Sequence, residues 1–192
     1  MKILIIEGPD NCGKDTAIHQ LMSKFYKTKI IHSQKPKSSD PVDALNEQYD
    51  LFLNQYKDAY FDYMMDSEDI LIFNRAWYGE YVYGQIYRNE NPTSIIELVN
   101  DIEDQFIYSE GLDLNDILYV QLMVDNYDFL CNNDDGLSLS KNNKELIEKE
   151  CNMFKEIFEH SKFNKTIINV NDGTSFRPKE DIMKEIYDAL NI

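Results

Sequence analysis

Blocks of apolar and polar residues alternate along the chain with the spacings of strands and helices. Five short, mostly aliphatic runs predict strands at 2–7, 29–33, 69–73, 116–124 and 166–170. Between and after them, apolar residues recur every three or four positions, which predicts helices at 14–26, 42–65, 77–87, 94–108, 144–160 and 179–190. Strands that alternate with helices indicate an α/β fold, a five-stranded parallel sheet with helices on both faces.

Composition narrows the class of protein. The 192 residues show no repeat or linker, so one domain spanning 1–192 is expected. A net charge of −16 disfavours binding to a nucleic-acid backbone, so no nucleic acid is expected as a partner. The three scattered cysteines indicate reduced thiols, and no apolar run approaches membrane-spanning length. The chain opens directly on a strand without a signal peptide, so we expect a cytoplasmic protein with no membrane partner.

A phosphate-binding loop is predicted where the first strand ends. The sequence from Gly8 to Thr16 is GPDNCGKDT, and it joins an apolar strand to a helix. The two glycines let backbone N–H groups curl around an anion at the helix N-terminus, and Lys14 adds an ammonium for the β and γ phosphates. The residues expected to hold a nucleoside triphosphate are Gly8, Pro9, Asn11, Cys12, Gly13, Lys14, Asp15 and Thr16. Cys12 is expected to fill a tight turn, with a reactive thiol as the alternative.

One position in this loop departs from the usual motif. The Ser or Thr that normally follows the lysine and binds magnesium is replaced by Asp15. A carboxylate there repels phosphate unless it faces the metal directly or through water. Asp15 is therefore a predicted magnesium ligand.

Four polar segments follow predicted strands, where α/β enzymes place their ligands. They are 32–39, 74–75, 131–143 and 171–177. Because parallel strands end at one edge of the sheet, these segments are expected to converge on the phosphate loop. The segment 131–143 is predicted to be a short lid.

Two motifs together resemble the thymidylate kinases and related deoxynucleoside monophosphate kinases, in a divergent, phage-like form. The first is GPDxxGKxT at Gly8 to Thr16, and the second is NRAWYGEYVYG at Asn74 to Gly84, which is similar to the family signature DRxxxSxxAYQ. The resemblance implies the P-loop nucleotide-kinase fold and ATP-dependent transfer of the γ-phosphoryl group to a deoxynucleoside monophosphate, with dTMP as the first expected acceptor. It also implies Mg²⁺, small-molecule nucleotides as the partners, and the option of a homodimer.

The resemblance assigns roles residue by residue. Asp10 matches the acid that accepts a hydrogen bond from the acceptor 3′-hydroxyl, and Arg75 the arginine on the acceptor phosphate. Tyr83 matches the tyrosine beside the deoxyribose. Phe52, with Asn54 or Gln55, falls near the base-binding positions, although the aromatic residues of this helix have core packing as their alternative. The segment from Asn171 to Phe176 resembles the one that cradles adenine, which makes Asn171 a predicted ATP contact.

The departures from the family pattern define the alternatives. Asn74 stands where the signature has Asp, so it keeps an oxygen for hydrated magnesium but loses the charge. Neither the phosphate loop nor the lid contains the family's catalytic arginine, and Lys141 is the one cation of the lid. Lys14, Arg75 and Lys141 are therefore the predicted catalytic residues. The alternatives are a deoxynucleoside kinase and a catalytically weak nucleotide-binding protein that retains the fold.

Overall fold

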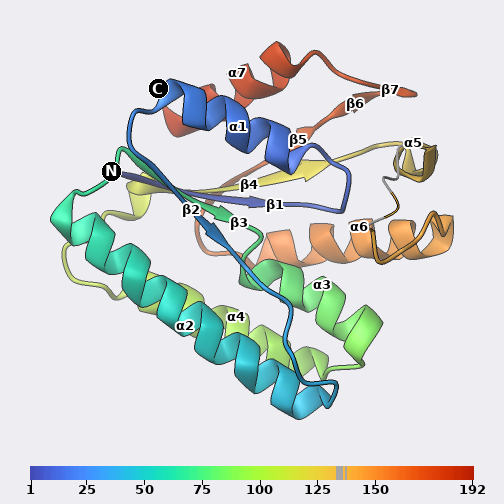
Figure 1. Ribbon diagram of the computed structural model, residues 1–192, viewed down its shortest axis with the longest axis horizontal. Coiled ribbons are helices and arrows are strands. Elements are labelled where there is room, and N and C mark those ends of the chain that lie inside the picture. The colour runs from blue at the N-terminus through green and yellow to red at the C-terminus, as the bar shows by residue number, and fades with distance from the viewer. Residues whose placement is uncertain (133–135, 137) are drawn as a thin grey trace.

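The computed structural model describes residues 1–132, 136 and 138–192, and it shows a five-stranded sheet between two layers of helices (Figure 1). The strands are β1 Lys2–Glu7, β2 Thr28–His32, β3 Ile70–Asn74, β4 Ile117–Met123 and β5 Asn164–Asn169. Their spatial order is β2-β3-β1-β4-β5, and each neighbouring pair is parallel. The predicted five-stranded parallel sheet is confirmed.

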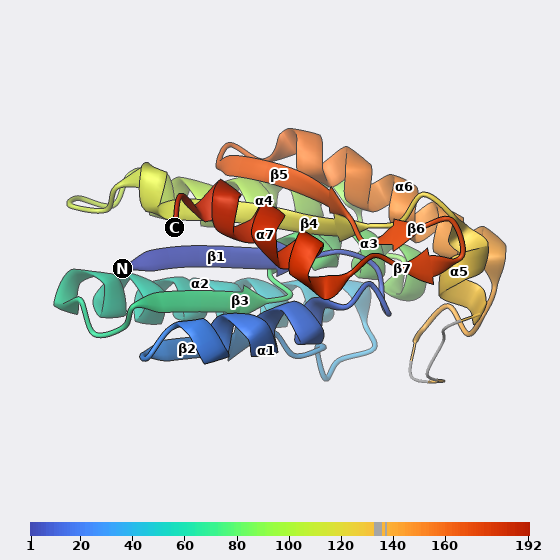
Figure 2. The ribbon, with the colours of Figure 1, turned by 90° about the horizontal axis from the view of Figure 1, so that it is seen from above.

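Helices cover both faces of this sheet, as predicted. On one face lie α1 Lys14–Lys24 and α7 Lys179–Leu190, and on the other lie α2 Pro41–Met65, α3 Trp77–Arg88, α4 Pro92–Ile107 and α6 Lys144–His160 (Figure 1). The short helix α5 Tyr127–Asn132 and an antiparallel pair, β6 Asn171–Asp172 and β7 Ser175–Phe176, lie together at one end of the molecule (Figure 2). A single 3-10 turn, η1 Leu114–Asp116, leads into β4.

The order of the strands explains the apolar runs in the sequence. The central strands β1, β3 and β4 are covered on both sides, so nearly every residue in them is buried. The edge strands β2 and β5 are only partly buried, and they carry more polar residues. The core therefore lies along β1, the strand that leads into the phosphate loop.

Local capping chemistry sets where α2 and α4 begin. Asp40 accepts from the Val42 and Asp43 N–H groups at 2.9 and 3.1 Å, and Asn91 accepts from Thr93 N–H at 2.9 Å. In both helices a proline follows the cap at the first helical position, where its missing N–H has no cost. α2 and α3 end at Asp66 and Asn89, which adopt left-handed conformations with φ of 48° and 56°.

Several boundaries and three short elements differ from the sequence-based expectation. The first helix ends at Lys24, because Phe25 is extended, and β5 begins at Asn164 rather than at 166. The sequence analysis missed α5, η1 and the β6–β7 pair, whose two- to six-residue lengths are too short to show periodicity. The predicted lid 131–143 begins inside α5, and residues 133–135 and 137 of it lie outside the described residues.

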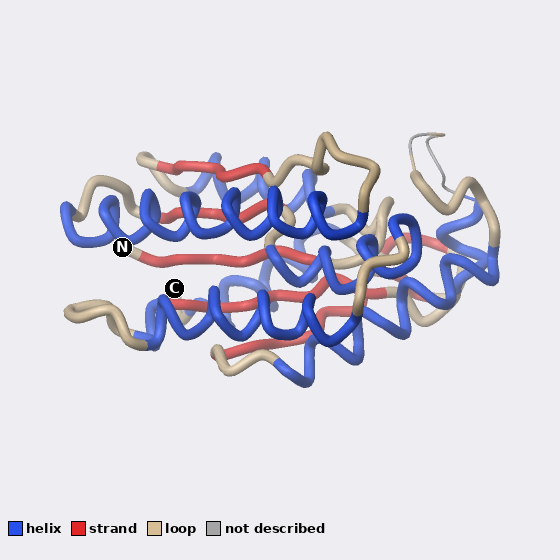
Figure 3. The backbone as a smooth tube through the Cα atoms, turned by 90° about the horizontal axis from the view of Figure 1, so that it is seen from below, coloured by secondary structure: helices blue, strands red, loops and turns tan. Residues whose placement is uncertain are grey.

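The strand order also determines where a ligand site is expected. The chain passes from β1 outward to β2 and β3, and then returns past β1 to add β4 and β5 on its other side. Figure 3 shows the strands of the sheet side by side among the helices. The carboxyl end of β1 is thus a topological switch point, where open α/β sheets bind their ligands. None of the helices in the described part of the chain is long and apolar enough to span a bilayer.

Candidate active site

The loop after β1 has the backbone shape of an anion cradle. Asn11 and Gly13 both adopt left-handed conformations, with φ of 63° and 77°, which aims successive N–H groups to one side. Gly8 has φ of 140°, and a Cβ there would lie 2.1 Å from the Leu122 carbonyl oxygen of β4. Only glycine fits position 8, so the close packing of β1 against β4 fixes the start of the loop.

Lys14 is held inside this loop. Its Nζ donates to the Gly8 and Pro9 carbonyl oxygens at 2.8 and 2.6 Å, and the residue is 5% exposed. Burial lowers the pKa of the Lys14 ammonium. Anionic phosphate oxygens placed against the loop would favour the charged form again, so Lys14 is suited to bind phosphate.

Asp15 and Asn74 form a linked pair at the ends of α1 and β3. The Asn74 amide nitrogen donates to Asp15 Oδ1 at 2.9 Å and lies 3.2 Å from His32 Nδ1. Asn74 Oδ1 is buried and has no hydrogen-bond partner among the described residues. A carboxylate and an amide oxygen therefore lie side by side. Mg²⁺ prefers hard oxygen ligands of this kind, and its bound waters can donate hydrogen bonds to them. The two predicted metal residues therefore fit the metal chemically.

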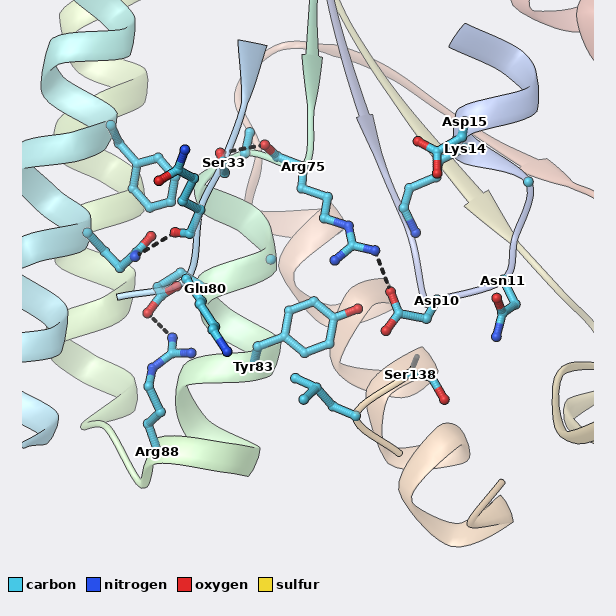
Figure 4. Close-up of a pocket in the computed structure, with 18 of the residues that line it drawn as sticks. Asp10, Asn11, Lys14, Asp15, Ser33, Arg75, Glu80, Tyr83, Arg88 and Ser138 are labelled. Atoms are coloured by element: carbon cyan, nitrogen blue, oxygen red, sulfur yellow. Dashed lines mark hydrogen bonds and ion pairs between the residues drawn. The ribbon is translucent and has the colours of Figure 1, made fainter. Parts of the chain in front are cut away.

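Arg75 reaches back toward the phosphate loop. Its Nη2 donates to Asp10 Oδ1 at 2.7 Å, and the side chain is 49% exposed on the cavity side (Figure 4). The backbone of Arg75 is left-handed with φ of 63°, and it is fixed by an N–H bond to the Ile6 carbonyl and by a bond from Ser33 Oγ to its own carbonyl at 2.6 Å. Strained backbone held at both sides is typical of functional positions.

A cavity of about 700 Å³ joins these groups to α2 and α3. Phe52 and Tyr83 line it from α2 and α3, and the Tyr83 ring points toward Arg75 and Asp10 (Figure 4). The Tyr83 hydroxyl is buried and has no partner among the described residues. The lining residues are Asp10, Asn11, Gly13, Lys14, Asp15, Thr16, Ser33, Gln34, Lys35, Gln48, Phe52, Arg75, Ala76, Gly79, Glu80, Tyr83, Arg88, Ser138, Leu139 and Phe176.

The charge of this cavity contrasts with the charge of the chain. Four of its lining residues are cations, namely Lys14, Lys35, Arg75 and Arg88, against three acids, Asp10, Asp15 and Glu80, although the whole chain has a net charge of −16. An acidic surface repels phosphate, so a concave cluster of cations is the part of the described surface where an anionic ligand is favoured.

Glu7, at the end of β1, links the two halves of the cavity. Its Oε1 accepts from Ala76 N–H at 2.5 Å and from Gly79 N–H at 3.2 Å, so a side chain from β1 caps the N-terminus of α3. The residue is fully buried, and burial raises the pKa of its carboxyl to about 7 against the lowering effect of those N–H bonds and of Lys14. Glu7 thereby fixes Arg75 and α3 relative to the phosphate loop.

Two further carboxyls of the site are also buried. Glu80 contacts Arg88, and burial raises the pKa of its carboxyl to about 8 while the guanidinium acts in the opposite direction. Glu150, on α6, accepts from the Tyr87 hydroxyl at 2.5 Å, and burial raises its pKa to about 7. Buried acids with raised pKa values are concentrated at functional sites. Of these three acids, Glu80 lines the cavity, and Glu7 and Glu150 lie close enough to Lys14 for its charge to lower their pKa values.

The remaining predicted site residues lie at the edge of this cavity or outside it. Cys12 is 1% exposed, and burial raises the pKa of its thiol to about 12, which favours the packing role over the reactive one. Asn171 is 3% exposed, and it accepts from Asp125 N–H and donates to the Gly173 carbonyl, both at 2.9 Å. It therefore orders the β6–β7 turn that brings Phe176 to the cavity. Lys141 is exposed and is not among the described lining residues.

Sequence reasoning missed most of the cavity lining from α2 and α3. Gln48, Glu80 and Arg88 come from two helices, and Gln48 lines the cavity whereas Gln55 bonds to the His32 carbonyl at 3.4 Å. One available signal was the chain's scarcity of arginine, because Arg88 is one of only three. The other available signal was the position of Glu80 within the second motif, five residues after Arg75.

The fold and the loop together define a structural class. A parallel sheet of order β2-β3-β1-β4-β5, whose central strand runs into a phosphate-binding loop, is the fold of the P-loop nucleotide kinases. Neither a protein-family model nor a curated protein sequence matches the chain.

Solved structures share this fold over nearly the whole chain. The YorR protein of Bacillus subtilis, in complex with phosphorylated GDP, has a TM-score of 0.67 and 16% identity, covering 99% of this chain and 96% of its own. The thymidylate kinase of Ehrlichia chaffeensis has a TM-score of 0.63 and 14% identity, covering 98% of both chains. The deoxyadenosine kinase of M. mycoides has a TM-score of 0.56 and 13% identity, covering 98% of both. These identities establish likeness of fold.

Proposed function

We propose that this protein is an ATP-dependent deoxynucleoside monophosphate kinase with dTMP as its first acceptor. The observation that carries the proposal is one cavity in which the Lys14 phosphate loop faces the Arg75, Asp10 and Tyr83 cluster. The solved structures that share this fold include thymidylate kinases, which agrees with that choice of acceptor.

Positions in the cavity suggest a division of labour. The loop amides and Lys14 bind the donor's phosphates, and Arg75 binds the acceptor's phosphate with the planar fork of its guanidinium. Tyr83 lies beside the expected sugar, where its bulk disfavours a 2′-hydroxyl. Asp15 and Asn74 would hold magnesium, directly or through its waters, and the bound ion would offset charge on the donor phosphates.

Transfer in this arrangement depends on positioning and electrostatics. Phosphoryl transfer needs no covalent intermediate when donor and acceptor are aligned and their charge is balanced. The ion pair of Arg75 with Asp10 keeps the guanidinium near the loop, and the Glu7 bonds to Ala76 and Gly79 hold that geometry. Lys141 is proposed to bring positive charge to the transferred group when both nucleotides are bound.

The test is a coupled assay with ATP and Mg²⁺ over all deoxynucleoside monophosphates and the corresponding nucleosides. We expect ADP release with monophosphates, dTMP among them, and none with nucleosides. A nucleoside kinase needs a carboxylate that takes the proton of the 5′-hydroxyl, and Asn74 is not suited to that role. Lys14→Ala is the negative control. Turnover of nucleosides alone would support a deoxynucleoside kinase, and nucleotide binding without turnover would support a catalytically weak binding protein.

A further inference from the structure

The part of the cavity farthest from the phosphate loop holds an ion pair that the transfer reaction does not use. Glu80 and Arg88 both line the cavity from α3, and an Arg88 Nη2 to Glu80 Oε1 contact joins them (Figure 4). Phe52 and Gln48 line the cavity from α2. Asp10, Lys14 and Asp15 lie on the opposite side in this view, so the pair is placed away from the donor phosphates.

The pair is supported from behind by a third buried group. Arg88 Nε donates to Glu90 Oε1 at 2.6 Å, and the Glu90 side chain is 0% exposed. Asn89 adopts a left-handed conformation, which turns the chain so that Glu90 N–H bonds to the Gly84 carbonyl at 3.1 Å. A Cβ at position 84 would lie 2.5 Å from Glu90 Oε2, so Gly84 makes room for this carboxylate.

Stability does not explain this arrangement. It places two carboxylates and one guanidinium where the side chains are at most 16% exposed, with Glu90 Oε2 unpartnered among the described residues. Buried ion pairs are often no more stabilising than apolar residues of similar volume, because both partners lose their hydration. A fixed acceptor oxygen beside fixed N–H donors, facing a cavity, is instead a recognition surface.

We infer that Glu80 and Arg88 recognise the base of the acceptor nucleotide by its lactam edge, an N–H beside a C=O. A Glu80 oxygen accepts from the ring N–H, and N–H groups of Arg88 beyond the two that contact Glu80 and Glu90 donate to the adjacent carbonyl. This inference rests on the proposed function. With the acceptor's phosphate at Arg75, its base is directed toward the part of the cavity between α2 and α3.

The chemistry divides the bases into two groups. Thymine and uracil present N3–H beside O4, and guanine presents N1–H beside O6, so all three match the pair. Cytosine and adenine present a bare ring nitrogen beside an amino group. The ring nitrogen, an acceptor, would face the acceptor oxygen of Glu80, and the amino group, a donor, would face the N–H donors of Arg88. Burial favours the protonated form of the Glu80 carboxyl, whereas Arg88 and an arriving ring N–H favour the ionised form, which accepts.

The first experiment leaves the protein unchanged. We expect kcat/KM for dTMP, dUMP and dGMP to exceed that for dCMP and dAMP by about 100-fold or more, since sites built to hydrogen-bond a ligand reject mismatched analogues strongly. N3-methyl-dTMP, which lacks the ring N–H, should show a comparable loss. Values for dTMP and dCMP within about threefold of each other would overturn the inference.

A substitution then tests the residue. A glutamine amide presents either an oxygen or an N–H₂ group, so Glu80→Gln should narrow the dTMP to dCMP ratio at least about tenfold. The matched control is Glu103→Gln, a buried carboxyl on α4 that contacts Lys162 N–H at 3.1 Å and does not line the cavity in the described part of the chain. Its ratio should equal the parent's. An unchanged ratio in Glu80→Gln, or an equal change in Glu103→Gln, would contradict the assignment.

Calorimetry separates this inference from the proposed function. If the protein binds ATP but transfers no phosphate, while dTMP binds more tightly than dCMP, the kinase proposal fails and the base inference stands. If both monophosphates bind equally, the base inference fails whether or not transfer occurs. If no monophosphate binds, both fail.

Discussion

The two ends of the cavity are built in different ways. The end at the loop after β1, which the proposed function makes the donor end, is built from backbone, and Lys14 is held there by two carbonyls of the same loop. The other end, which the proposed function makes the acceptor end, is built from side chains, and Phe52 on α2 lines it together with Glu80 and Arg88 on α3. The first is made by a single continuous stretch of chain, whereas the second requires two helices to pack correctly.

This difference has consequences for what each end can select. Backbone amides bind any polyphosphate, so the donor end favours charge and shape over base identity. Side chains with fixed donors and acceptors distinguish one base from another, and they change by single substitutions. Differences in specificity between proteins of this fold are therefore expected at the acceptor end, and catalysis by the donor end is expected to tolerate fewer changes.

The largest expected effect tests the donor end. Lys14→Ala should lower kcat at least about 1,000-fold, because one preorganised charge can contribute that much and Lys14 also bonds two carbonyls that shape the loop. Lys24→Ala, which removes a surface lysine that lies 3.8 Å from the Tyr187 ring centroid, is the control and should keep the parent rate. Circular dichroism establishes that both variants fold. Unchanged turnover in Lys14→Ala would remove the phosphate-loop assignment.

Arg75→Ala tests whether the two ends bind separate nucleotides. It removes two expected charge-assisted hydrogen bonds of about 1.5–3 kcal/mol each, so monophosphate affinity should fall at least about 100-fold. ATP affinity should change by less than about threefold, because the loop amides and Lys14 remain. Calorimetric titration with each nucleotide measures the difference. Equal losses for both would place Arg75 at the donor end.

Lys141 tests whether the segment after α5 contributes to both ends at once. Lys141→Ala should lower the transfer rate about tenfold or more with little change in either dissociation constant, and Lys141→Arg should keep or raise the rate. Lys144→Ala, a neighbouring exposed lysine that pairs with Asp128 at 2.6 Å, is the control. A parent-like rate in Lys141→Ala would show that the segment supplies no catalytic cation.

The smallest effect concerns the link between the ends. Because burial raises the pKa of Glu7 to about 7, the folded protein keeps a proton there that the unfolded chain has already lost above about pH 4.5. Stability from this group is therefore present below that pH and is lost as the pH rises through 7. Glu7→Gln keeps the acceptor oxygen for Ala76 and Gly79 but cannot ionise, so its unfolding free energy should exceed the parent's above pH 7 by roughly 1–3 kcal/mol.

Urea denaturation at pH 5 and pH 8 measures this difference. The two proteins should be similar at pH 5 and diverge at pH 8. Glu97→Gln, at an exposed position on α4, should follow the parent at both values. Parallel curves for Glu7→Gln and the parent would show that the carboxyl ionises as easily in the folded protein as in the unfolded one.

The same contrast explains how much the sequence revealed. The five strands, the major helices and the phosphate loop follow from local patterns, because Gly8, Gly13 and Lys14 act within one turn of chain. Asp10 and Arg75 came from the two motifs, and the structure shows them in contact. Those features depend on neighbours in sequence, or on residues that a motif names.

What could not be predicted depends on residues brought together by packing. The Asn74 bond to Asp15 joins positions 59 residues apart, so the sequence showed two departures from the motif without showing that they are partners. The Glu7 cap of α3 spans 69 residues. Glu90 lies beyond the end of a helix, and only the left-handed turn at Asn89 carries it back beneath Gly84.

Helix α3 is held by a buried carboxylate at each end, Glu7 at its first amides and Glu90 beyond its last turn. Its 12 residues span about 18 Å at 1.5 Å per residue, and neither end can slide without breaking one of these contacts. On the proposed function, α3 fixes the distance between the position of the acceptor's phosphate and the position of its base. One residue inserted between Arg75 and Glu80 would rotate the base-binding face by about 100°.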